Sequence, residues 1–298
     1  MDIIKNIGVI FISIFFESLP FLLLGSFISS IIEVYVSNEK IARLIPENRI
    51  LATITGIFLG FFLPACDCAV IPVSKRLLKK KVPINVAISF MLASPIINPV
   101  VLFSTYTAFY KTNPEIFWYR LILGIVVAFI IGIIMDILFS KKIILKNSLL
   151  EEDECVSCEC HHDDENKIMA IIKHTLIDMF EVVKYLMFGA LLASLVQVLI
   201  PRSVITVFNN SKVLSIIIMM LFAYLISLCS TSDSFVGKSL LSSFSKSSIL
   251  AYLLLGPMID IKNTIVLLGN YKKKFVTTLI FLIFIMIFIV SILVVNSI

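Results

Sequence analysis

Charged residues are scarce in this chain, and this scarcity decides its class. Only 15% of the 298 residues are Asp, Glu, Lys or Arg, whereas 59% are hydrophobic, and the mean hydropathy is +1.05. A soluble domain of this length has no interior large enough for so much apolar surface. Several segments have the length of about 20 apolar residues that a bilayer crossing needs. The sequence therefore predicts an all-α polytopic protein of the cell membrane, surrounded by membrane lipid.

Two further absences narrow the function. No G-x-x-x-x-G-K-[ST] phosphate-binding loop occurs, so we expect a protein that does not power itself with ATP. The first hydrophobic segment has no small-residue cleavage site after it, so we expect a retained membrane segment instead of a cleaved signal. Eight of the 20 acidic residues lie within 151–165, so the rest of the chain has 25 basic residues and only 12 acidic ones. Basic loops are typical of membrane proteins and do not indicate nucleic-acid binding.

Hydrophobic runs divide the chain into two halves around a polar linker. The eight runs lie near 7–36, 51–66, 84–109, 117–139, 168–200, 212–229, 249–270 and 275–296. We expect a first transmembrane repeat at 1–139, an acidic, Cys/His-rich cytoplasmic linker at 140–167 and a second transmembrane repeat at 168–298. Each repeat has four segments, or five if the halves are inverted. With the N-terminus inside and eight simple crossings, Lys75 and Arg76 lie on the cytoplasmic side, as the positive-inside rule favours.

Three sequence blocks recur in the same order in the two halves. FFESLPFLLLG resembles MFEVVKYLMFG, CDCAVIP resembles CSTSDSF, and FMLASPIINPVVL resembles YLLLGPMIDIKNTIVL. The alignment pairs Glu17 with Glu181, Pro95 with Pro257, and Asn98 with Asp260. Repeated halves with interrupted helices at matching positions are typical of secondary transporters, and the interruptions indicate the binding site.

Prolines interrupt the matching segments, and polar side chains follow the interruptions. A broken helix in a membrane exposes polar backbone groups, which are tolerated only where protein buries them or a wet cavity receives them. We therefore expect four broken-helix motifs to converge on one central site. Its thiols and carboxylates suit a soft cation or a thiophilic metalloid. The candidate substrate-binding residues are Cys66, Asp67, Cys68, Ser94, Pro95, Asn98, Cys229, Ser232, Asp233, Pro257 and Asp260.

Each of these residue types also has a purely structural interpretation. The cysteines could serve as small packing residues, and Asp67 and Asp233 could cap helices. Glu17 and Glu181 form either a proton-coupling pair or separate ion pairs that fix helix packing. Asp178 lies near a predicted membrane end, where we expect it to be solvated.

The linker carries a second group of metal-binding side chains, in the sequence EEDECVSCECHHDDE. Three thiols and two imidazoles come from Cys155, Cys158, Cys160, His161 and His162. Zn(II) and Cu(I) both take such ligands, although the spacing does not match a two-knuckle zinc ribbon. We expect a flexible segment that captures or senses zinc or copper, with a disordered acidic tether as the alternative. No cofactor is required.

The motifs together carry a family resemblance. PACDCAVIPVSKRLLKKKVPINVAISFMLASPIINPVV, CSTSDSFVG and LLLGPMIDIKN resemble the permease family that includes ArsP-type organoarsenical exporters and copper/zinc efflux transporters, over about residues 17–269. The resemblance implies an integral membrane permease, not an enzyme, that exports a metal or metalloid. The leading expectation is efflux of a soft metal ion such as copper or zinc by alternating access, either with or without proton coupling. The alternatives are export of trivalent organoarsenicals, and a membrane subunit of a larger complex that needs a partner subunit or a second copy of the chain.

Overall fold

The computed structural model describes residues 2–35, 45–46, 48–62, 69–80, 82–139, 164–199, 212–241 and 243–295. Every element in these ranges is an α-helix, which confirms the predicted class. The helices before the linker are α1 (Asp2–Tyr35), α3 (Arg49–Phe62), α4 (Val70–Lys79), α5 (Ile84–Ile97), α6 (Pro99–Phe109) and α7 (Glu115–Leu138). Those after it are α9 (Asp164–Leu199), α11 (Lys212–Ile226), α12 (Ser230–Leu240), α13 (Lys246–Met258), α14 (Ile261–Asn270) and α15 (Lys273–Val295).

Six helical segments of the described chain are long and apolar enough to cross a membrane. They are Ile4–Ile32, Ile84–Phe109, Glu115–Leu138, Ile171–Val198, Lys246–Asn270 and Lys273–Val294. The apolar helices α3 and α11 are shorter. Each of the eight predicted hydrophobic runs therefore contains a helix, while the number of complete crossings stays a prediction.

Two of the six segments are broken into half-helices, as the prolines predict. Helix α5 ends before Asn98, and Pro99 begins α6, where its missing N–H is not needed. Helix α13 ends before Ile259, and α14 begins after Asp260. The polar residue at each break caps the following half-helix. Asn98 Oδ1 accepts from the N–H of Val100 at 3.0 Å, and Asp260 Oδ1 accepts from the N–H of Asn263 at 2.6 Å.

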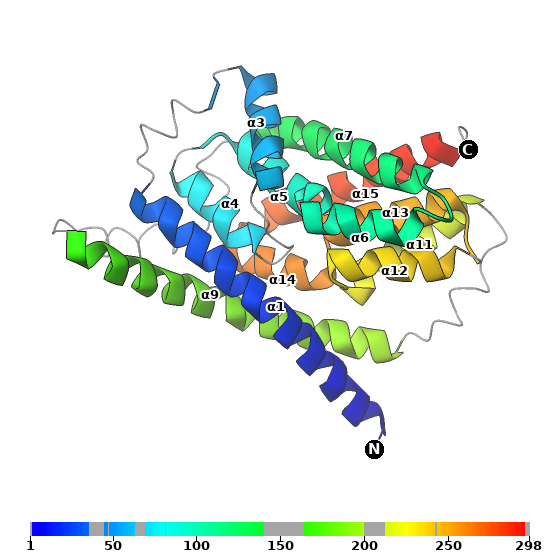
Figure 1. The fold of residues 1–298 in the computed structure, drawn as a ribbon, viewed down its shortest axis with the longest axis horizontal. Coiled ribbons are helices and arrows are strands. Elements are labelled where there is room, and N and C mark those ends of the chain that lie inside the picture. Colours follow the sequence, from blue (N-terminus) through cyan, green and yellow to red (C-terminus); the bar gives the residue numbers. More distant parts are fainter. Residues whose placement is uncertain are drawn as a thin grey trace.

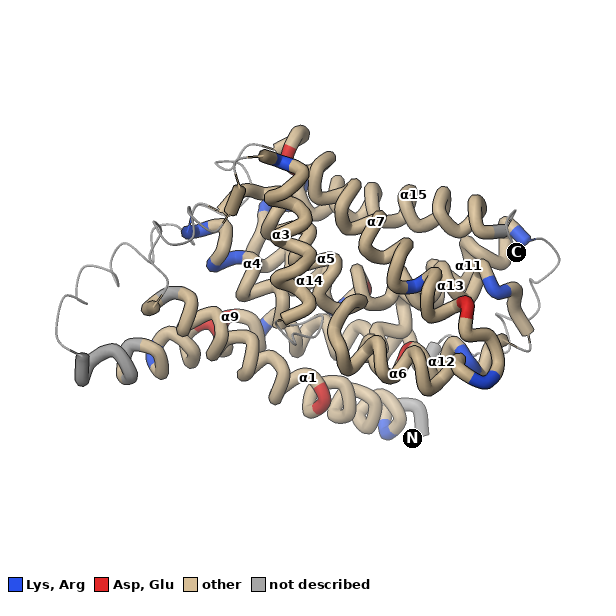
Figure 2. Tube along the Cα trace, turned by 45° about the horizontal axis from the view of Figure 1, so that its top comes forward, with Lys and Arg blue, Asp and Glu red and all other residues tan. Residues whose placement is uncertain are grey.

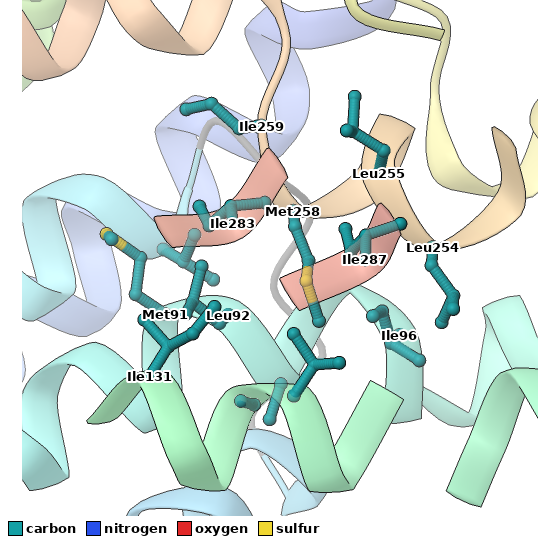
Figure 3. Packing of buried hydrophobic residues seen from close by; sticks show 14 of the residues in the cluster. Met91, Leu92, Ile96, Ile131, Leu254, Leu255, Met258, Ile259, Ile283 and Ile287 are labelled. Carbon is teal, nitrogen blue, oxygen red and sulfur yellow. The ribbon is translucent and has the colours of Figure 1, made fainter. Parts of the chain in front are cut away.

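Helices α5 and α13 form the centre of the fold. Every residue of α5 is buried, and so is almost every residue of α13, which fits helices that are apolar on all sides. They pack against each other, with α3 and α7 beside α5, and α11 and α15 beside α13. Figure 3 shows this core, in which Met91 of α5, Ile131 of α7, Met258 of α13 and Ile283 of α15 meet.

The long helices α1 and α9 lie side by side at the lower edge of the molecule in Figure 1, away from α7 and α15 at the upper edge. Helices α4 and α14 connect this pair to the centre, because α4 packs on α1 and α14 packs on α9. Small residues allow the close approach. A Cβ on Gly25 would lie 2.8 Å from Ala69 Cα, and one on Gly189 would lie 3.0 Å from Lys262 Cα.

Candidate functional site

Charged side chains are buried inside this apolar molecule. Figure 2 shows few charged residues along the helix bodies, and several of these are buried. Those with a relative exposure of 4% or less are Lys75, Arg76, Arg120, Asp178, Asp233, Asp260 and Lys262. Ionisable residues inside a membrane protein are costly unless they are partnered, and they mark candidate functional sites.

Two ion pairs join α4 to α9. Arg76 holds Asp178 with two contacts, from Nη2 to Oδ1 at 2.8 Å and from Nε to Oδ2 at 3.1 Å, in the bidentate geometry that strengthens such pairs. Ser29 of α1 also donates to Asp178 Oδ2, at 3.3 Å. Beside them, Lys75 Nζ lies 2.8 Å from Glu181 Oε2. Lys75, Arg76 and Asp178 are all buried on helices, so the prediction that Asp178 is solvated is wrong, while the cytoplasmic placement of Lys75 and Arg76 stays a prediction.

Glu17 and Glu181, which the repeat pairs with each other, have different surroundings. Glu181 is half-buried and holds Lys75, whereas Glu17 is exposed on α1. The two positions that the sequence alignment pairs therefore have different environments in the structure. The proton-coupling role of the two residues stays a prediction.

The break between α13 and α14 forms a polar junction with the turn before α12. Besides capping α14, Asp260 has its Oδ2 atom 3.4 Å from Lys262 Nζ. The N–H of Lys262 donates to Ser227 Oγ at 3.5 Å. Ser227 has a φ of 51°, the only positive φ of a non-glycine residue in the described ranges. Such backbone conformations are unfavourable and cluster at functional sites, because the surrounding structure must hold them in place.

Helix α12 places Asp233 at the same junction. Asp233 is 2% exposed, and its Oδ1 atom accepts a hydrogen bond from Tyr252 Oη of α13 at 2.8 Å. Asp260 and Lys262 act on Asp233 electrostatically across the junction. The start of α12 and the start of α14 therefore bring two carboxylates into one electrostatic environment.

Arg120 of α7 reaches the first turn of α12. It is fully buried, and Nη1 donates to Thr105 Oγ1 at 2.6 Å and to Ser234 Oγ at 2.8 Å, while Nη2 donates to the Ser230 carbonyl at 3.4 Å. Arg120 also acts on the charge of Asp233. This guanidinium therefore ties α6, α7 and the first turn of α12 together next to the junction.

A model of the ArsP-type family, described as "Predicted permease", matches residues 3–296. The chain belongs to this permease family. The permease is 41% identical to the UPF0718 protein YcgR of Bacillus subtilis (strain 168) over 272 residues. This alignment covers 91% of this chain and 90% of that protein. Over 273 residues the permease is 37% identical to a "Putative two-component membrane permease complex subunit" of Streptococcus mutans serotype c, covering 90% of this chain and 87% of that protein. No solved structure matches the chain.

The family match confirms the resemblance and the prediction of a multi-pass membrane permease. Together with the six apolar segments it places the permease in a membrane. The relatives favour a transporter over an enzyme. The family indicates no cofactor, and no group of three or more His, Cys, Asp or Glu side chains in the described ranges could hold a metal ion.

The predicted site residues of the permease fall into three groups. Cys229, Ser232, Asp233, Pro257 and Asp260 lie at the junction of α12, α13 and α14. Ser94, Pro95 and Asn98 lie at the end of α5, where Ser94 Oγ donates to the Gly60 carbonyl at 3.4 Å. The residues outside the described ranges are Cys66, Asp67, Cys68, Cys155, Cys158, Cys160, His161 and His162.

Sequence reasoning missed three polar residues of the permease's junction. Arg120 lies within the hydrophobic run near 117–139, and a charge in such a run is by itself a signal that could have found it. Lys262 directly follows the second proline break, so its position next to Asp260 could also have been noticed. Tyr252 carried no signal, because its hydroxyl finds Asp233 only through the packing of α12 on α13.

Proposed function

We propose that this permease exports a soft metal cation, such as copper or zinc, by alternating access. The observation that carries the proposal is the place of Cys229, which lies directly before the first residue of α12 and next to the junction of broken helices. Its Sγ atom accepts a hydrogen bond from Thr231 Oγ1 at 3.4 Å. Soft sulfur ligands favour Cu(I) and Zn(II). In this proposal Cys229, together with Cys66 and Cys68, supplies the sulfur that the substrate contacts.

The half-helices support a transport route through the centre. Because α6 and α14 start inside membrane-length segments, their first N–H groups need side-chain caps or a cavity. Alternating access requires the elements around such a site to move relative to one another. Substrate would pass the thiols as this junction opens to one side of the membrane and then to the other.

The proposal includes a two-repeat architecture. The helices before the linker have 34, 14, 10, 14, 11 and 24 residues, and those after it have 36, 15, 11, 13, 10 and 23. This shared order of lengths supports the sequence alignment of the two halves. Transporters built from such repeats bind substrate at the interface between the repeats.

Two other functions have a specific observation in their favour. The same thiols would hold trivalent arsenic, so export of organoarsenicals fits the same residues. The relative from Streptococcus mutans is named as the subunit of a complex, which favours a partner subunit for this chain as well. In the first case the linker ligands Cys155 to His162 are dispensable, and in the second the chain alone transports nothing.

Uptake into everted membrane vesicles tests the proposal. The probes are Zn²⁺, Cu⁺ and a trivalent phenylarsenical, and the variants are Cys229→Ser, Asp260→Asn and a deletion of 155–162. We expect zinc or copper uptake that Cys229→Ser abolishes. Gly8→Ala is the control, since a Cβ there meets nothing within 4 Å. Uptake of the arsenical alone, with no effect of the deletion, would overturn the metal assignment. If uptake appears only when a partner is co-expressed, the chain is a subunit of a larger complex.

A further inference from the structure

Asp233 differs from the other buried carboxylates in the described part of the permease. Asp178 is held by Arg76, and Asp260 lies 3.4 Å from Lys262 Nζ, but no ion pair of Asp233 occurs among the described residues. Its Oδ1 atom accepts from Tyr252 Oη, while its Oδ2 atom is buried without a hydrogen-bond partner in the same ranges. Burying an ionised carboxylate without a partner for this oxygen costs free energy, and protonation of the oxygen removes the charge.

The Oδ2 atom of Asp233 lies in close packing against α13. The Oδ2 atom lies so close to the backbone of α13 that a Cβ on Gly256 would be only 2.8 Å away. Hard cations take about six oxygen ligands and need room for them. A hydrogen atom on Oδ2 needs no such shell. Protonation of Oδ2 is therefore compatible with this close packing.

The charged groups around Asp233 favour opposite protonation states of its carboxyl group. Arg120 of α7 and Lys262 of α14 favour the ionised carboxylate, whereas Asp260 favours the protonated one. Tyr252 of α13 is a neutral donor. Helix α6, which also packs on α12, presents the hydroxyls of Ser104 and Thr105. Movement of α14 relative to α12 would change the distances to Asp260 and Lys262, and so the preference of Asp233 for its proton.

We propose that Asp233 is the proton-carrying residue of this permease. Its Oδ2 atom takes a proton from water on one side of the membrane, forming one O–H bond, and that bond breaks when the proton is released to water on the other side. Tyr252 Oη donates to Oδ1 in both states, because Oδ1 is an acceptor in the acid and in the carboxylate. Asp233 thus takes the role that the sequence suggested for Glu17 and Glu181. The coupling to substrate rests on the proposed transport function, whereas proton binding by Asp233 does not.

Infrared difference spectroscopy of the full chain in lipid nanodiscs tests the proton binding without any substrate. Spectra taken between acidic and alkaline pH should show the C=O stretch of a protonated, buried carboxyl in the wild type. Asp233→Asn should lose this band. Tyr252→Phe should shift the band, because the hydrogen bond to Oδ1 is lost, and this second variant serves if Asp233→Asn does not fold. Glu115→Gln, a change at an exposed carboxylate, should retain the band. A band that survives in Asp233→Asn, or that Tyr252→Phe leaves unmoved, would overturn the proposal.

Vesicle transport tests the coupling. With Zn²⁺ as the probe, a pH gradient should stimulate uptake by the wild type and by Glu115→Gln, whereas Asp233→Asn should show no stimulation by the gradient. Stimulation of Asp233→Asn equal to that of the wild type would refute the coupling role. If the wild type moves neither zinc, copper nor the arsenical, the proposed substrates fail, and the infrared result alone decides whether Asp233 carries a proton.

Discussion

The bidentate pair of Arg76 and Asp178 allows a sharp test of what holds α4 against α9. The side chains are only 3% and 6% exposed, so Asp178→Asn leaves a guanidinium charge in the protein interior without its carboxylate. Breaking a buried ion pair in this way costs about 3–5 kcal/mol, because the remaining charge has lost its compensation. At roughly 2–4 °C per kcal/mol for a large domain, the midpoint of thermal unfolding should fall by about 6–20 °C.

The assay is size-exclusion chromatography of detergent-purified protein after heating. The double variant Arg76→Met/Asp178→Leu should recover most of the loss, since apolar side chains of similar volume replace a buried pair at little cost. Glu115→Gln is the control, because its pair with Lys246 is exposed, at 60% and 37%, and is worth about 0–1 kcal/mol. A midpoint for Asp178→Asn no lower than that of Glu115→Gln, or a double variant as unstable as the single one, would refute the reasoning.

Three further predictions use the same unfolding assay. Gly56→Ala should destabilise the folded permease by about 1–3 kcal/mol, because the new Cβ would lie 2.5 Å from the Val86 carbonyl oxygen of α5. Gly8→Ala should leave the unfolding midpoint unchanged. Equal midpoints for the two variants would contradict the close α3–α5 contact. Asn98→Ala should cost about 0.5–2 kcal/mol by removing the cap of α6. Asn98→Ser should restore most of this loss, since serine caps about as well and brings no charge into this buried position; a failure of Asn98→Ser to restore stability would show that the cap is not the cause. Lys75→Met should cost less than Asp178→Asn, about 1–2 kcal/mol, because its partner Glu181 is 23% exposed and retains water; a loss as large as that of Asp178→Asn would contradict this ranking.

The broken helices are the part of this fold that the sequence predicts well. Proline removes a backbone donor and restricts its neighbours, so the breaks after α5 and α13 follow from local chemistry. The polar residue after each proline, Asn98 in one half and Asp260 in the other, caps the next half-helix for the same local reason. Local rules suffice because each cap acts within three residues of the chain.

The buried ion pairs are the part that the sequence does not reveal. Lys75 and Glu181 are 106 residues apart, and Arg76 and Asp178 are 102 apart. Basic residues near the end of a hydrophobic run look like loop residues until a partner helix covers them, and only the packing of α1, α4 and α9 does so. The environment of Asp233 escapes prediction for the same reason, because Gly256, Tyr252 and Arg120 reach it from two other helices.

The contacts of α4 determine which parts of the molecule can move as units. Through its ion pairs α4 belongs with α9, and α1 and α14 pack on these two helices, so this group takes members from both sides of the linker. Helices α3, α5, α7, α11, α13 and α15 form a second mixed group around the core of Figure 3. In a rearrangement that keeps the buried pairs intact, α4 would stay with α9, and its contact with α5 would change. The two groups are interleaved in sequence, and the polypeptide passes between them several times, at the loops and breaks that join its short helices.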